Sequence, residues 1–539
     1  MTEVRRAFNA ALLHVPHPSP DWGARTAPAG TVNPTVVLIT SCAGLFLIAV
    51  NTTVINTALN AIADDLRMGS GELSWAVGIY MLAVASFVVL GGRLGDLLGE
   101  RTVFLGGLAA FSVGALLVAT AADQWMVIVG RLVQGTGSAL LMPATMAMLR
   151  IAFSADRQGF ALGIWGATGG IGFALGPLIG GALTDALSWR WVWWGSLIYV
   201  AVLALFAAGS LRAMPRPSER PRIDYLGVAL LAVSLFGLIL ALQEGPEWGW
   251  GSAPSIAAFA VAAGAGLGLV LFELRTDEPL LHLRLLRKRA LLGANVGTFA
   301  NTLFLIGVIY FFNLYAQAVV TLDCSAMLAS VALLPFGLSM FATSLAMGPL
   351  ADRVGFRWPV AAGLALLGVG GLLLGRLDSA SDYGGIWWLL VIVGVGTGIT
   401  FSAPSAAGLR ALPSEHAGEA SGIINVVRYV SAALVISLGT ILFTEVGSDE
   451  LNDSLKRAGA SAVEEDRLDN VLTGAPSQVS ETEAKLGRAA REDFRTGADE
   501  GISRGFAAVM LALGIAAFAS MAAWLLLMRA GRPAEPQGP

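Results

Sequence analysis

The sequence predicts an all-α integral membrane protein with fourteen transmembrane helices. Of its 539 residues, 55% are hydrophobic and only 13% are charged, about half the charged share of a soluble globular protein. One membrane helix needs about 20 mostly apolar residues, so the apolar total suffices for about fourteen helices. This composition excludes a water-soluble enzyme, a nucleic-acid-binding protein and a disordered scaffold. The net charge of −4 is too small to indicate a charged partner.

Fourteen apolar stretches, each bounded by charged residues, Pro or Gly, are long enough to cross a bilayer. Strands of a membrane barrel would be about ten residues long with alternating polarity, a pattern that the sequence does not show. An even number of helices places both termini on the same side. We expect the helices at 35–60, 73–92, 102–121, 125–149, 159–184, 191–210, 224–243, 254–273, 290–318, 325–350, 357–376, 386–408, 419–444 and 504–528.

Basic residues indicate which side carries the termini, because cytoplasmic loops are enriched in Lys and Arg. Sixteen basic residues lie in the loops after even-numbered helices, against three in the short loops on the other side. These three are Arg67, Arg190 and Arg376. Both termini are therefore predicted to be cytoplasmic. The acidic segment 445–503 then lies outside, and we expect a solvated helical cap there rather than a ligand-binding module.

A loop motif that occurs twice organises the chain. Residues 92–101 and 348–357 both read G-x-L-x-D-x-x-G-x-R, in which glycine allows a tight turn and Asp can cap a helix or pair with Arg. The repeat predicts two homologous six-helix halves with a helix pair inserted between them. The gating candidates here are Asp96, Arg101, Asp352 and Arg353. The predicted segments are tail 1–34, bundle 35–210, linker 211–222, inserted pair 223–274, loop 275–289, bundle 290–528 and tail 529–539.

With these motifs the chain resembles the major facilitator superfamily, specifically its fourteen-span drug/proton antiporter branch. The resemblance covers about 35–530 and also rests on 130–135 (GRLVQG), 172–181 (GFALGPLIGG) and 188–191 (SWRW). It implies two bundles around a central cavity that opens alternately to each side, small-molecule substrates and a proton gradient as energy source.

The fifth helix carries Gly172, Gly176 and Gly180 at a spacing of four, and Pro177 directly follows Gly176. Such a small face lets membrane helices approach closely, and proline adds a kink that neighbours must satisfy. Packing and function explain this pattern equally well. The resemblance implies that the face meets the other half and seals a leak, so these four residues are gating candidates.

The fourth helix carries a polar stripe that begins at Arg131 near the outer surface. Gln134, Ser138 and Met142 continue it at helical spacing as candidate cavity residues, and Thr145 lies on the same face. A charge within a span faces either a cavity or a partner, or extends to the interface. The resemblance implies a role for this arginine in proton coupling or substrate-dependent switching.

The ninth helix carries a second polar stripe, and the thirteenth adds weaker candidates. Amides and phenols amid apolar walls suit an amphipathic organic ligand, although hydrogen bonding between helices explains them as well. The stripe consists of Asn295, Thr298, Thr302, Asn313 and Gln317, with Asn301, Tyr310 and Tyr315 nearby. The candidates of the thirteenth helix are Asn425, for the cavity, and Arg428, for gating.

The first helix departs from the family pattern at Asn51, where the fourteen-span branch usually has Asp. An amide cannot exchange a proton, whereas a buried carboxylate with a raised pKa can. No acid lies at a span centre, so three explanations stay open: a terminal acid such as Glu244 or Asp64 binds the proton, transport uses no ion, or the substrate carries the charge. Thr53 and Asn56 are further cavity candidates.

The predicted function is export of amphipathic small organic molecules across a bacterial cell membrane, with proton coupling and as a monomer. The alternative is a narrow exporter of a lipid or secondary metabolite with weak or no coupling. A polytopic membrane transferase and a channel fit the repeated motif poorly, and no ATP-binding G-x-x-x-x-G-K-[ST] occurs. We expect no cofactor, metal site or nucleic-acid partner, and unpaired thiols at Cys42 and Cys324.

Overall fold

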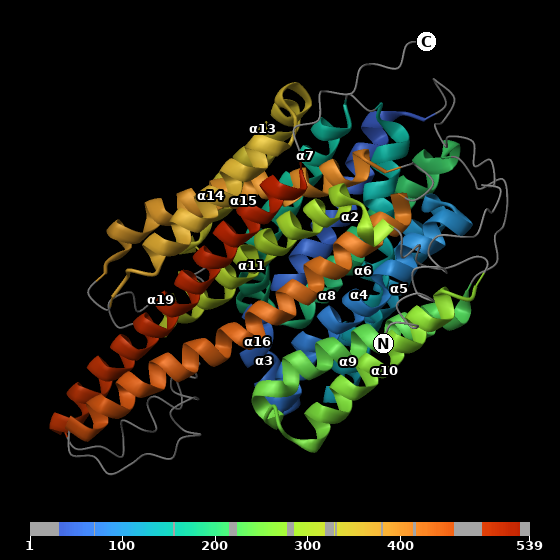
Figure 1. The fold of residues 1–539 in the computed structure, drawn as a ribbon. Coiled ribbons are helices and arrows are strands. Elements are labelled where there is room, and N and C mark those ends of the chain that lie inside the picture. Colours follow the sequence, from blue (N-terminus) through green and yellow to red (C-terminus); the bar gives the residue numbers. More distant parts are fainter. Residues whose placement is uncertain are drawn as a thin grey trace.

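The chain folds into long, closely packed helices (Figure 1). The computed structural model describes residues 32–68, 70–154, 157–214, 224–276, 285–318, 328, 331–378, 381–412, 417–457 and 488–528. Within these ranges, fourteen helices are long and apolar enough to cross a membrane. The all-α class and the number of predicted spans are therefore confirmed.

The first half begins where Asn33 caps a helix, since its side-chain oxygen accepts a hydrogen bond from the backbone N–H of Thr35 at 3.0 Å. The first expected span, 35–60, is divided at Val54 into two consecutive helices. The helices of this half are α2 (Pro34–Thr53), α3 (Ile55–Leu66), α4 (Ser70–Leu98), α5 (Glu100–Ala119), α6 (Gln124–Ala152), α7 (Gln158–Ala186) and α8 (Arg190–Ser210).

The second half follows the inserted pair, α9 (Tyr225–Trp248) and α10 (Ala253–Glu273). It comprises α11 (Arg289–Ala318), α13 (Leu334–Val354), α14 (Arg357–Leu374), α15 (Tyr383–Arg410), α16 (Ala417–Arg457) and α19 (Arg488–Leu527). Helix α9 packs against α4 of the first half and α16 of the second. Ile79, Ile239 and Ala433 from these three helices share one buried apolar cluster, so the inserted pair bridges the halves along one flank.

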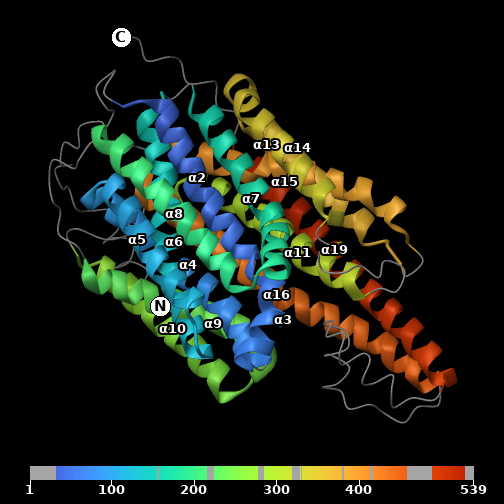
Figure 2. The same ribbon diagram turned by 180° about the vertical axis from the view of Figure 1, so that it is seen from behind.

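The two halves converge at one end of the molecule and diverge at the other (Figure 2). We call the end where α2 begins and α19 ends the terminal side, and the opposite end the loop side. At the terminal side α13 packs on α7 and α16 on α4. A Cβ at Gly348 of α13 would lie 2.4 Å from the carbonyl oxygen of Gly159, and one at Gly422 of α16 would lie 3.1 Å from the Cα of Val89. The backbones of the two halves thus touch there.

The repeated loop motif has the same conformation in both halves. Its second glycine has a positive φ in each copy, 87° at Gly99 and 77° at Gly355, which is the left-handed region that glycine adopts without strain. The residues before it continue α4 and α13. The final arginine donates to a backbone carbonyl of the sixth helix of its own half: Arg101 to α8 at 3.0 Å and Arg357 to α19 at 3.4 Å. Matching contacts support the predicted repeat.

Helices α16 and α19 extend beyond the expected ends of their membrane spans, into the range 445–503. They pack against each other, and Leu451 and Phe494 are fully buried between the described helices. Because these apolar side chains are covered by the partner helix, both ends remain helical well past the expected boundaries. The segment 458–487 lies outside the described residues.

At the loop side, the first half is held by an ion pair between Arg190 and Asp65. Trp189 also donates its indole N–H to this carboxylate at 3.0 Å, and Arg190 donates to the carbonyl of Ala121 at 2.9 Å. The hydrogen bonds from Arg190 and then Trp189 hold the pKa of Asp65 below its ordinary value. The segment 188–191 thus ties together the ends of α3, α5 and α8.

Candidate functional site

Arg131 is the centre of a buried hydrogen-bond cluster in the first half. Its side chain is fully buried, so it does not extend to the membrane surface. It donates to the carbonyl of Ala76 at 3.2 Å, the carbonyl of Asn51 at 3.4 Å and the side-chain oxygen of Gln134 at 3.3 Å. Its guanidinium also lies 4.2 Å from the ring centroid of Tyr80. Arg131 therefore joins α2, α4 and α6 through neutral acceptors.

The other polar residues predicted in this half extend the same cluster. The side-chain N–H of Asn51 donates to the Leu47 carbonyl at 3.0 Å, and Trp193 of α8 donates to Gln134 at 3.2 Å. The hydroxyls of Ser138 and Tyr80 lie 2.9 Å apart. The structure thus brings together four helices around the predicted stripe, through contacts that lie inside one half.

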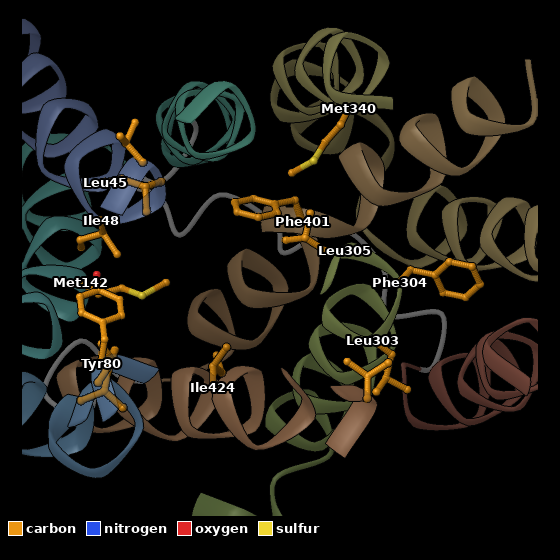
Figure 3. Packing of buried hydrophobic residues seen from close by; sticks show 14 of the residues in the cluster. Leu45, Ile48, Tyr80, Met142, Leu303, Phe304, Leu305, Met340, Phe401 and Ile424 are labelled. Carbon is orange, nitrogen blue, oxygen red and sulfur yellow. The ribbon is translucent and has the colours of Figure 1, made fainter. Parts of the chain in front are cut away.

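Met142 carries this stripe to the boundary between the halves. The hydroxyl of Tyr429 on α16 donates to the Met142 sulfur at 3.1 Å, and Ser421 donates to the Met146 sulfur at 3.6 Å. Figure 3 shows Met142 beside Tyr80 on the side of the first half, with Ile424 of α16 nearby. Helix α6 therefore reaches from the Arg131 cluster to the second half.

Asn301, which lies beside the polar stripe on α11, faces its own half. Asn301 donates to the carbonyl of Thr397 at 2.9 Å and to the hydroxyl of Thr400 at 3.0 Å, which joins α11 to α15. Thr302 is buried, and its hydroxyl has no hydrogen-bond partner among the described residues. Hydrogen bonding between helices therefore explains the amide of Asn301, which is the alternative to a ligand contact that the sequence left open.

Two further candidates, Asn425 and Arg428, lie on α16. The side-chain N–H of Asn425 donates to the Ser421 carbonyl at 2.9 Å. The Arg428 guanidinium lies 5.0 Å from the ring centroid of Phe401 on α15. Both polar side chains are buried, and they belong to the second half.

The remaining predicted site residues lie apart from the Arg131 cluster and from the candidates on α11 and α16. Tyr310 packs edge-on against Phe311, with ring centroids 5.0 Å apart, and the half-buried Asn313 lies one turn nearer the loop side. Asp96 lies close enough to Arg150 for their charges to interact. Arg353 instead lines a surface depression of about 670 Å³ at the terminal side, between α2, α7 and α13. The side chains of Asn56, Gln317 and Asp352 lie outside the described residues.

Buried carboxylates lie only near helix ends in the part of the chain that the structure describes. Glu100 is the first residue of α5, Glu273 is the last residue of α10, and Glu244 lies in the final turns of α9. Within the same ranges, no group of three His, Cys, Asp or Glu side chains is placed to hold a metal ion. Away from the helix ends, the buried charges of the described residues are therefore the cations Arg131 and Arg428.

Comparison with known proteins identifies the family of this chain. Residues 41–436 match the Major Facilitator Superfamily. The chain belongs to that superfamily. A cephamycin export protein of Amycolatopsis lactamdurans is 33% identical over 79% of this chain and 87% of its own length. A tetracenomycin C resistance and export protein of Streptomyces glaucescens is 29% identical over 80% of each chain.

The fold of this superfamily member is also found in solved structures. The human organic anion transporter MFSD10 superposes with a TM-score of 0.57 at 14% identity, covering 90% of this chain and 98% of that one. At this identity the likeness shows a common fold alone. Family membership makes the chain a multi-pass membrane transporter rather than an enzyme, as the motifs predicted.

The glycine face of α7 corrects one expectation drawn from the family. A Cβ at Gly172 would lie 2.7 Å from the Cβ of Ala49, and one at Gly176 would lie 2.0 Å from the hydroxyl of Thr53. A Cβ at Gly180 would meet α3. This face, on the same helix as Pro177, therefore packs against α2 and α3 of its own half, because those helices approach it closely. The expectation that it meets the other half is wrong for this structure.

The contact with the other half uses an earlier stretch of α7, which sequence reasoning missed. A Cβ at Gly163 would lie 3.0 Å from the Ser344 carbonyl, and one at Gly166 would lie 2.8 Å from the ring of Phe401. Gly163 and Gly166 follow Gly159 at helical spacing, which is the same signal that marked the later glycines. The spacing alone does not reveal which helix each face meets.

Proposed function

We propose that this superfamily member exports amphipathic small organic molecules by alternating access between its two halves. The observation that carries this proposal is the asymmetry of their contact. The halves touch through small residues at the terminal side, and buried polar side chains of both halves lie behind that contact. A transporter with this arrangement exposes its substrate site by separating the halves at one side and closing them at the other.

The proposed direction of transport is outward. Arginine-rich loops support a cytoplasmic terminal side, and in this proposal the halves are therefore closed toward the cytoplasm. Relatives named for the export of cephamycin and tetracenomycin C support outward transport of such organic compounds. Transport proceeds with a monomer and without ATP in this proposal.

For the energy source, we propose coupling to the proton gradient. The family resemblance supports it, while Asn51 and the position of all described buried carboxylates near helix ends favour a second candidate, a narrow exporter with weak or no coupling. The Asn51 carbonyl lies 3.4 Å from an Arg131 nitrogen. A carboxylate at residue 51 would thus belong to the same residue whose backbone carbonyl already accepts a hydrogen bond from Arg131.

Uptake into everted membrane vesicles tests the proposal. A panel of neutral, cationic and anionic amphipathic dyes is offered to wild type, Asn51→Asp and Gly181→Ala, with and without an imposed pH gradient and with and without an uncoupler. A Cβ at Gly181 meets no atom within 4 Å, so that variant is the control. We expect wild-type uptake of at least one dye, its loss with the uncoupler, and stimulation in Asn51→Asp.

The outcomes separate the two parts of the proposal. Uptake no greater than in vesicles without the protein, for every dye, would refute export. Uptake that ignores both the uncoupler and an imposed pH gradient would refute proton coupling and establish the second candidate.

A further inference from the structure

The two arginines that are buried away from the helix ends differ in how their nitrogens are satisfied. Arg131 donates three hydrogen bonds to protein acceptors. Arg428 is 7% exposed, yet its Nε and Nη1 have no hydrogen-bond partner among the described residues. A buried polar group without a partner is rare in folded proteins and calls for a specific explanation. A buried arginine in a membrane helix is also a marker of a functional site.

Arg428 lies at the boundary between the two halves. Its guanidinium stacks on Phe401, and Phe401 packs against Trp165 of α7 in the first half, with ring centroids 6.4 Å apart. The next residue, Tyr429, donates to Met142 of the first half. Figure 3 shows Phe401 projecting between Leu45 of α2 and Leu305 of α11. Any group that binds the free N–H donors of Arg428 is therefore placed where the halves meet.

The described part of the protein offers no anion to this cation. Its buried carboxylates lie near the helix ends, on α5, α9 and α10. The face of Phe401 attracts the guanidinium, but an aromatic face does not use the in-plane N–H donors. A carboxylate does, since it accepts two parallel N–H bonds from one guanidinium.

We propose that Arg428 and Phe401 form an anion subsite of the transport site, and that the substrates include amphipathic organic anions. The guanidinium binds a carboxylate of the substrate, and the Phe401 ring packs against its apolar part. This inference rests on the proposed export function and narrows its substrate class. It also gives the third explanation for Asn51 a structural basis, because the substrate itself supplies the negative charge.

A matched pair of probes tests the subsite. Purified protein in nanodiscs is titrated with 7-diethylaminocoumarin-3-carboxylate and with its uncharged methyl ester, and binding is followed by fluorescence anisotropy. The variants are Arg428→Gln, Arg428→Lys and, as the charge-matched control, Arg376→Gln. Arg376 is exposed just beyond the end of α14.

We expect wild type to bind the carboxylate more tightly than the ester. Arg428→Gln should weaken carboxylate binding at least about tenfold, as for loss of a charge-assisted hydrogen bond, and change ester binding less than about twofold. Arg428→Lys should restore most of the loss, and Arg376→Gln should match wild type. Retained ester binding shows that Arg428→Gln is folded.

Four results would overturn the subsite. One is unchanged carboxylate binding in Arg428→Gln. The second is an equal loss for both probes in Arg428→Gln and Arg428→Lys, which indicates a structural role for the arginine. The third is wild-type binding of the ester but not of the carboxylate, in which case export of uncharged compounds still stands and only the anion subsite fails. Wild-type binding of neither probe also counts against the subsite, while export is judged separately by the vesicle panel.

Discussion

A methyl group added at Gly348 should disfavour closure of the two halves at the terminal side. The Cβ of Gly348→Ala would lie 2.4 Å from the carbonyl oxygen of Gly159 and 2.9 Å from the Cα of Phe160. Both atoms belong to the backbone of the other half and cannot move aside as a flexible side chain does. Overpacking of this kind costs about 1–3 kcal/mol.

The cost falls on only one conformation. Because the clash is between halves, it disappears when they separate, and each half folds as before. A bias of about 1–3 kcal/mol changes the ratio of two states about 5- to 150-fold. Gly348→Ala should therefore shift the protein toward the state open at the terminal side by that factor, with little change in its thermal stability.

The assay uses a reporter on the opposite edge of the contact. Ser421 of α16 is 2% exposed and contacts Met146. With both native cysteines replaced, Ser421→Cys is labelled from the terminal side with a membrane-impermeant maleimide. Gly348→Ala should accelerate labelling about 5- to 150-fold, and Gly181→Ala should leave it unchanged. Wild-type labelling rates in a folded Gly348→Ala protein would refute the reasoning.

Three further predictions concern contacts within the halves. Gly176→Leu should reduce the yield of folded protein together with transport, because its Cβ alone would lie 2.0 Å from the Thr53 hydroxyl; normal yield and melting temperature would contradict this packing role. Asp65→Asn should lower stability by less than about 1 kcal/mol, since the pair with Arg190 is partly exposed. The hydrogen bonds from Arg190 and then Trp189 hold the pKa of Asp65 below its ordinary value, so this difference is present above the ordinary pKa of an aspartate and should vanish as the pH falls through the lowered pKa. A difference in melting temperature that does not depend on pH would be inconsistent with the ion pair. Asn301→Ala should cost about 1–2 kcal/mol by removing two buried hydrogen bonds, measured as a lower melting temperature, and no loss would mean that this link is dispensable.

The sequence was sufficient for the fold because its main signals are local. The length of each apolar stretch, the bounding charges and the repeated loop motif each act within one or two helices. The positive φ of both Gly99 and Gly355 follows from the motif itself. The helical extensions of α16 and α19 were missed because they depend on packing between two helices far apart in the sequence, which buries Leu451 of α16 and Phe494 of α19.

The site was less predictable, because helical spacing identifies a face but not the helix that this face meets. Gly163 and Gly176 belong to similar glycine patterns on α7, yet the first meets the other half and the second meets α2. Arg131 and Arg428 are both arginines within spans, but only the structure shows that Arg131 is satisfied by protein acceptors while two nitrogens of Arg428 are not.

Reversible cross-linking of the halves tests the central claim, alternating access, most directly. Met146→Cys and Ser421→Cys place thiols where two side chains of α6 and α16 lie 3.6 Å apart. The control pair, Ser234→Cys and Ala262→Cys, joins α9 to α10, where the Ser234 hydroxyl donates to the Ala262 carbonyl at 2.9 Å. Each pair, without the native cysteines, is treated with a short bis-methanethiosulfonate in everted vesicles. Cross-linking across the halves should stop dye uptake and dithiothreitol should restore it, while the control pair transports throughout. Undiminished uptake with the halves cross-linked would contradict alternating access.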